Sequence, residues 1–103
     1  MADYFLVKHV PGPTWDHSRR RREQAGWDEH AAFMDALTAE GVIVLGGPVG
    51  TGDGDYALLV IVARDETDLR RRLAADPWAD SVVTIESVEP WAVWLGAERL
   101  TEG

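Results

Sequence analysis

The sequence predicts one α+β domain in which strands and helices follow the order βαββαβ. Two observations support this prediction. Apolar runs typical of strands and helices alternate along the chain in that order. The length, 103 residues of which 46% are hydrophobic, suits a single domain. Right-handed crossovers would place both helices on one face of a four-stranded antiparallel sheet, which is the ferredoxin-like arrangement.

Four segments are rich in aromatic, β-branched or other apolar residues and are predicted as strands: 3–10, 42–46, 56–63 and 82–89. The glycine-rich stretch 49–55 is predicted as the hairpin loop between the two middle strands. A further extended stretch is expected at 91–95, after Pro90.

Two segments are predicted as helices. In residues 24–40, apolar side chains recur at spacings of three and four, and Gly41 is placed to end the helix as a left-handed cap. The second helix is expected over residues 66–75, with Asp65 as its N-cap and Pro77 preventing its continuation.

We expect one domain over residues 1–103, with a core at about 4–95, a loop insert at 11–22 and a tail at 96–103. The net charge of -8 argues against nucleic acid and anionic membranes as partners. The absence of cysteine excludes disulfides, thiolate metal sites and a thiol nucleophile. The sequence shows neither a signal peptide nor an apolar run of membrane-spanning length. We therefore expect a cytoplasmic protein.

The two middle strands are continuously apolar rather than alternating between apolar and polar residues. A sheet with one face in water should show that alternation, so both faces of this sheet are expected to be buried. Two helices cover one face only, and five tryptophans are many for one small core. We therefore expect a homodimer that forms through the open sheet face.

One histidine and one aspartate are candidates for proton transfer. His30 lies on the apolar face of the first predicted helix, and imidazole can donate or accept a proton near neutral pH. Asp76 ends the second predicted helix, from which its carboxylate can orient the imidazole. Each residue also has a structural interpretation: a core histidine bonded to a backbone carbonyl, and an Asp-Pro turn.

The other two histidines are expected at the surface. His9 shares a strand face with Phe5 and Val7, and we expect a surface histidine at a strand end, with a pocket-lining role as the alternative. His17 is expected to be solvated. The three histidines lack the spacing of metal ligands, so we expect no metal.

Several further segments have a structural and a functional interpretation. Gly46-Gly47-Pro48 is expected to form a tight bend after a strand, or else a backbone that approaches a ligand closely. The segment 50–54 lacks the context of a phosphate-binding loop and is expected to be a hairpin loop. The run Arg19–Arg22 is expected to be solvated, or else to make a pocket mouth positive. Trp15, Trp27 and Trp78 are expected in the core or a dimer interface, or else as a platform for a ligand.

Three segments resemble the YCII-related (YciI-like) proteins: REQAGWDEHAAFMDAL at 22–37, GVIVLGGP at 41–48 and ADPW at 75–78. The resemblance runs from about Tyr4 to Leu95. It implies a ferredoxin-like fold of the dimeric α/β-barrel type and a His–Asp pair as the active site, which corresponds here to His30 and Asp76. The chain departs from the shorter bacterial members in its 11–22 insert and in Trp78, where Tyr or Phe is common.

The resemblance also implies a class of reaction. A relative is a dehydrochlorinase that acts on a chlorinated hydroxyquinol, and the superfamily includes muconolactone isomerases and cofactor-free monooxygenases. We therefore expect a small cofactor-independent enzyme of lyase or isomerase type, dehalogenation included, which acts on a small anionic aromatic molecule. His30 and Asp76 would be catalytic, and the residues expected to contact substrate are Phe5, Trp27, Gly47, Pro48 and Trp78.

Two alternatives to this enzyme remain open. One is a non-catalytic dimeric module that binds a ligand or has a structural role. The other is a monooxygenase that is cofactor-free or binds haem. A separation between His30 and Asp76 of more than about 6 Å would weaken the enzyme hypothesis, because hydrogen bonding would be out of reach.

Overall fold

The structure is a computed structural model that describes residues 3–51 and 56–100. Its elements follow the order β1 (Asp3–Pro11), η1 (Arg21–Glu23), α1 (Trp27–Ala39), β2 (Ile43–Val49), β3 (Tyr56–Ala63), α2 (Glu66–Leu73), β4 (Val83–Pro90) and η2 (Ala97–Leu100). The elements η1 and η2 are short 3-10 helices. The predicted βαββαβ order is therefore confirmed.

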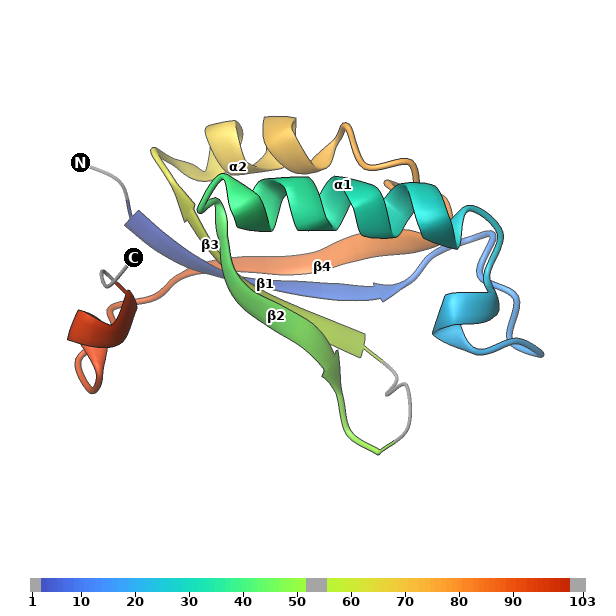
Figure 1. The fold of residues 1–103 in the computed structure, drawn as a ribbon, viewed down its shortest axis with the longest axis horizontal. Coiled ribbons are helices and arrows are strands. Elements are labelled where there is room, and N and C mark those ends of the chain that lie inside the picture. The colour runs from blue at the N-terminus through green and yellow to red at the C-terminus, as the bar shows by residue number, and fades with distance from the viewer. Residues whose placement is uncertain (1–2, 52–55, 101–103) are drawn as a thin grey trace.

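The strands form one four-stranded sheet in the order β2-β3-β1-β4, and each neighbouring pair is antiparallel. β1 lies in the middle, where Val7 pairs with Leu59 of β3 and with Val88 of β4. Both long helices lie on the same side of the sheet (Figure 1). This topology confirms the predicted ferredoxin-like fold.

The main core lies between the sheet and the two helices. Alternation along β1 buries Phe5, Val7 and His9, while the residues between them are less buried. The buried apolar residues of this core are Phe5, Val7, Leu37, Ile43, Leu59, Ile61, Ala63, Leu69 and Leu73. Full burial of an aliphatic side chain contributes about 1.5–3 kcal/mol, so this cluster fixes the helices on the sheet.

The opposite face of the sheet carries a second set of apolar side chains. Leu6 of β1 pairs with Val60 of β3, and Val60 also pairs with Leu45 of β2. These three residues alternate with the residues that face the helices. Leu45 is 58% exposed. Neither long helix covers this face, which is the lower one in Figure 1.

The second strand is longer than predicted, and the bend predicted at Gly46-Gly47-Pro48 is wrong. These residues continue β2 and pair with Leu59, Leu58 and Ala57 of β3. A Cβ atom at Gly46 would lie 2.6 Å from a methyl carbon of Leu59, so the close approach is to a neighbouring strand. Pro48 is tolerated because β2 is an edge strand.

The first helix begins later than predicted. Gly26 precedes α1 in a left-handed conformation with φ 78°, and η1 occupies Arg21–Glu23. The Gln24 side chain fastens this segment: its Nε2 donates to the Asp16 carbonyl at 2.8 Å, and its Oε1 accepts from the Asp16 amide at 2.9 Å.

The arginine run in this segment is only partly solvated. Arg19, Arg20 and Arg22 are exposed as expected, but Arg21 is 8% exposed. The guanidinium of Arg21 lies 5.1 Å from the centre of the Trp15 ring. For Arg21 the prediction of a solvated side chain is therefore wrong.

The second helix ends at Leu73, two residues earlier than predicted. Asp65 is its N-cap, as predicted, and accepts a hydrogen bond from the Asp68 amide at 2.8 Å. The predicted extended stretch 91–95 has no regular structure. Residues 52–55 of the predicted hairpin loop lie outside the described residues. In the described part of the chain, no helix has the length and apolarity to cross a membrane.

Candidate functional site

His30 and Asp76 meet in the interior, although 46 positions separate them in the sequence. His30 lies in the first turn of α1, and Asp76 lies in the turn after α2. Nδ1 of His30 lies 2.8 Å from Oδ1 and 3.0 Å from Oδ2 of Asp76. Both residues are buried, at 8% and 5% exposure. The distance between the His30 and Asp76 side chains is therefore far below the separation of about 6 Å that would have weakened the enzyme hypothesis.

Local backbone contacts fix the Asp76 carboxylate. Its Oδ1 also accepts a hydrogen bond from the Trp78 amide at 2.9 Å. The Asp76 amide donates to the Leu73 carbonyl at 3.1 Å, and the Ala79 amide donates to the Asp76 carbonyl at 2.9 Å. An ionised carboxylate can only accept hydrogen bonds, so Nδ1 of His30 must carry the hydrogen that it shares with Asp76.

Tryptophans surround the imidazole of His30. The Trp78 ring is stacked on it, with centroids 3.9 Å apart and planes 9° apart, and Trp27 lies at 5.8 Å. Trp78 is 1% exposed, and its Nε1 donates to the Ala25 carbonyl at 2.8 Å. Trp15 meets Trp78 edge to face at 6.5 Å. Trp78 therefore belongs to a small second core, against which Trp15 and Trp27 pack.

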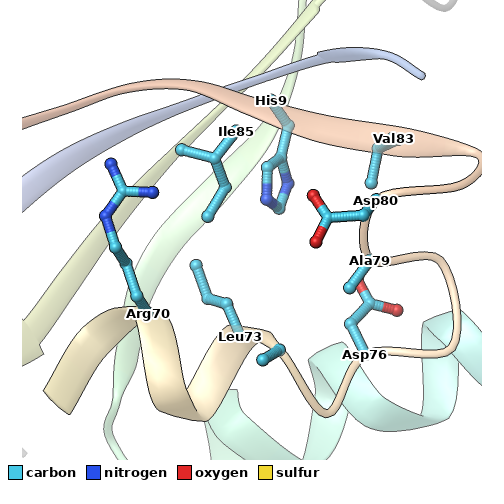
Figure 2. Close-up of a pocket in the computed structure, with 9 residues that line it drawn as sticks. His9, Arg70, Leu73, Asp76, Ala79, Asp80, Val83 and Ile85 are labelled. Atoms are coloured by element: carbon cyan, nitrogen blue, oxygen red, sulfur yellow. The ribbon is translucent and has the colours of Figure 1, made fainter. Parts of the chain in front are cut away.

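A cavity of about 290 Å³ lies beside the pair, between the end of α2 and strand β4 (Figure 2). Its apolar wall consists of Leu73, Ala74, Ala79, Val83 and Ile85, and its polar groups are His9, Arg70, Asp76 and Asp80. Asp76 lines this cavity, whereas His30 is not among its lining residues. The side chains of both members are nearly closed off from solvent, at 10% exposure for His30 and 2% for Asp76, and the pair borders the cavity through Asp76.

His9 is buried in the cavity wall, so the expectation of a surface histidine is wrong. The residue is 6% exposed and pairs with Ala57 on one side and Ile85 on the other. Burial lowers the pKa of His9 from 6.5 to about 4, because the charged form loses its hydration. Asp76 opposes this shift, while His30 and Arg21 add to it. The imidazole of His9 is therefore neutral at pH 7.

Two charged residues at the cavity were not identified from the sequence. Arg70 lies on α2, and its Nε donates to Glu66 Oε2 at 2.7 Å. Asp80 has φ 57°, a left-handed conformation that aspartate adopts more readily than most residues. For the α2 wall of the cavity a signal was available in the sequence. Arg70, Leu73 and Ala74 have the i, i+3, i+4 spacing that places residues on one helix face. The sequence offered no comparable signal for Asp80.

The residues expected to contact substrate occupy different places. Trp27 and Trp78 lie against His30, and Phe5 lies in the main core. Gly47 and Pro48 lie in β2, at the opposite edge of the sheet from β4. None of the five is among the residues that line the cavity. Their contact with substrate stays a prediction.

The remaining histidine is exposed: His17 lies on the surface, as expected. Within residues 3–51 and 56–100, no group of three or more His, Cys, Asp or Glu side chains is placed to hold a metal ion.

Comparison with known proteins gives a family for the chain. No curated protein matches the sequence. The family model of the YCII-related domain matches residues 4–92, which is most of the chain and includes both His30 and Asp76. The resemblance noted from the sequence is thereby confirmed, and the chain belongs to the YCII-related domain family.

Proposed function

We propose that the protein is a small cofactor-independent enzyme that moves a proton on a small anionic aromatic molecule, as a lyase or an isomerase does. One observation carries the proposal: a buried His–Asp pair is hydrogen-bonded at 2.8 Å, and its aspartate lines a cavity of about 290 Å³. That volume is near the lower end of the range for ligand pockets, so it suits a molecule with one ring.

The His30–Asp76 pair has the chemistry for this task. Nδ1 of His30 already carries the hydrogen that it shares with Asp76, and Asp76 is the member of the pair that lines the cavity, so the Asp76 carboxylate takes up the proton. The N–H group of His30 stays hydrogen-bonded to Asp76 and keeps it in place. In an isomerisation, the pair takes a proton from one carbon and returns it to another. In a dehalogenation, the proton of a C–H bond goes to the His30–Asp76 pair. The two electrons of that C–H bond form a C=C bond, and the halide leaves with the electrons of the C–X bond.

The cavity wall supports the same reaction. Leu73, Val83 and Ile85 give the cavity an apolar wall, and electrostatic interactions beside such a wall are stronger than in water. Arg70 places a positive charge at the cavity, where it can bind an anionic substituent. Glu66 holds one side of the guanidinium and leaves the remaining N–H groups for a ligand.

Exchange of carbon-bound hydrogen with deuterated water tests this proposal. The protein is incubated in D₂O with a panel of small phenols, chlorophenols and unsaturated keto acids, and NMR follows deuterium incorporation and loss of halide. We expect exchange of at least one compound, slowed about 100-fold or more in Asp76→Asn, because the amide cannot take up the proton. The matched control His17→Gln changes an exposed histidine and should exchange at the wild-type rate. Exchange that is undiminished in Asp76→Asn would contradict the proposal.

One observation favours a second function, a non-catalytic ligand-binding module. His30 does not line the cavity, so a ligand can occupy the site without touching the imidazole. Under this alternative, compounds of the panel shift the NMR signals of cavity residues while no deuterium is incorporated.

We also propose that two copies of the chain pair through the open face of the sheet. The support is the apolar set on that face, in which Leu45 is exposed, Leu6 is half-buried and Val60, which pairs with both, is 4% exposed. Trp94 and Leu95, after β4, are 87% and 93% exposed and add further uncovered apolar surface. An exposed apolar patch of this kind is typical of an interaction site.

A further inference from the structure

His9 faces the cavity from the strand side, and the mechanism proposed above does not use it. Figure 2 shows its ring pointing from the sheet toward the space that Asp80 and Leu73 also line. β1 is a central strand with partners on both sides, so the position of the His9 backbone is fixed. A rigid scaffold of this kind suits a group that must meet a substrate atom accurately.

The surroundings keep this ring uncharged. Its pKa of about 4 results first from burial, and the positive charge of Arg21 acts in the same direction. The charged groups that face it across the cavity are Asp76, Asp80 and Arg70. A neutral imidazole has one N–H donor and one lone-pair nitrogen. Such a ring can donate a hydrogen bond to an oxygen without giving up its proton, which is a known role of neutral histidine in isomerases.

We propose that His9 is a catalytic residue that donates its ring N–H to the carbonyl oxygen of the substrate, which becomes an enolate or phenolate oxygen during the reaction. The inference rests on the proposed function and narrows its substrate class. The substrate carries such an oxygen in conjugation with the carbon whose proton is moved. Hydrogen bonds directed at a developing oxyanion are among the strongest contributions to catalysis in a site shielded from water.

The step balances without any further reactant. The C–H bond breaks, and its proton passes to the His30–Asp76 pair. The electron pair of that bond enters the conjugated system and comes to rest on the oxygen, which becomes an enolate or phenolate. His9 keeps its proton and shares it with this oxygen. When the pair returns the proton to a different carbon, the electron pair moves back and the carbonyl is restored.

Binding of 4-nitrophenolate tests the inference, because this probe is a single-ring oxyanion whose visible absorption band shifts when a donor binds the oxygen. The full chain is titrated with the probe at mildly alkaline pH. The variants are His9→Leu, which removes the donor, and His9→Gln, which keeps an N–H group. Arg70→Gln and His17→Gln serve as comparisons, and nitrobenzene, which lacks the oxygen, serves as the matched probe. Circular dichroism establishes that each variant is folded.

We expect saturable binding with a shifted band in the wild type, and binding about tenfold or more weaker in His9→Leu, since the bond is made to a charged oxygen. His9→Gln should stay within about threefold of the wild type, and nitrobenzene should bind equally to wild type and His9→Leu. Ring ¹⁵N signals of His9 should shift on binding. The exposed His17→Gln should bind as the wild type does.

Two results would overturn the inference. One is wild-type affinity in His9→Leu, most clearly if Arg70→Gln alone abolishes binding. The other is the absence of saturable probe binding in the wild type. Failure of the proposed function is a separate result: His9-dependent binding together with no deuterium exchange in any compound would retain the donor role of His9 and leave a binding module.

Discussion

Asp76 is held in the candidate site by hydrogen bonds of the turn that follows α2. Its backbone and side chain accept hydrogen bonds from Ala79 and Trp78, so the turn after α2 fixes the carboxylate before any ligand arrives. The stacked Trp78 ring fixes the plane of the His30 imidazole in turn. A preorganised pair of this kind needs little rearrangement when it takes up a proton.

The depressed pKa of His9 predicts a pH dependence of stability. Between pH 6.5 and about 4 the unfolded chain binds a proton at His9 that the folded chain does not bind, so acidification through this window favours unfolding. This residue alone should lower the free energy of unfolding by about 3 kcal/mol at the acid end of the window. Urea unfolding of wild type and His9→Gln at a series of pH values measures the difference.

The control for this experiment is the exposed histidine. His17→Gln should follow the wild-type curve, because His17 is exposed and a surface substitution of this kind changes stability little. Parallel curves for wild type and His9→Gln would show that His9 is not buried in solution.

The sequence was sufficient to predict His30 and Asp76 but not the rest of the cavity. Helical spacing placed His30 on an inward face, the end of the second predicted helix made Asp76 its candidate partner, and the family resemblance implied the same pair. The burial of His9 depends on β4 and on the end of α2, about 65 to 75 positions away in the sequence. Asp80 lines the cavity from a turn in which its own backbone is left-handed. No residue pattern predicted that conformation.

At the scale of elements, the residues that connect η1 to α1 determine the position of Trp78. Gly26 has φ 78°, and a Cβ atom there would lie 3.3 Å from Nε1 of Trp78. That nitrogen also donates to Ala25. The glycine is needed both for its backbone conformation and for the space beside the indole.

Gly26→Ala should therefore destabilise the fold and disturb the site together. We expect the free energy of unfolding to fall by about 1–2 kcal/mol, since an alanine is strained at positive φ. Trp78 should shift, which near-UV circular dichroism detects. Gly41→Ala is the matched control, because Gly41 also has positive φ, 81°, but a Cβ atom there meets nothing within 4 Å. Equal near-UV spectra for wild type and Gly26→Ala would refute the contact.

The strands and helices themselves were predictable from residue patterns, and so were some of their ends, including both ends of β3 and the start of α2. The aromatic and β-branched residues of 3–10 and the apolar run 56–63 identify β1 and β3 correctly. The Gly-Gly-Pro sequence is typical of a bend, but pairing with β3 keeps it in a strand. Similarly, the helical pattern from residue 24 continues through Gly26, where the backbone turns left-handed before α1 begins.

For the whole molecule, the uncovered sheet face predicts association. We expect size-exclusion chromatography with light scattering at micromolar concentration to give twice the chain mass of 11.4 kDa. Leu45→Lys, which places a charge on the open face, should shift the protein toward a monomer. Ala39→Lys is the control, because this exposed residue ends α1 on the other side of the sheet. A stable wild-type monomer would contradict the proposed dimer.

The central claim is that His30 and Asp76 act as one hydrogen-bonded unit in solution, and the Nδ1 proton of His30 reports on it most directly. NMR of ¹⁵N-labelled protein detects this proton and its exchange with water. We predict a proton on Nδ1 that exchanges slowly in the wild type and rapidly in Asp76→Ala, since the carboxylate is its acceptor. An Nδ1 without a proton in the wild type, or an exchange rate that Asp76→Ala leaves unchanged, would contradict the account.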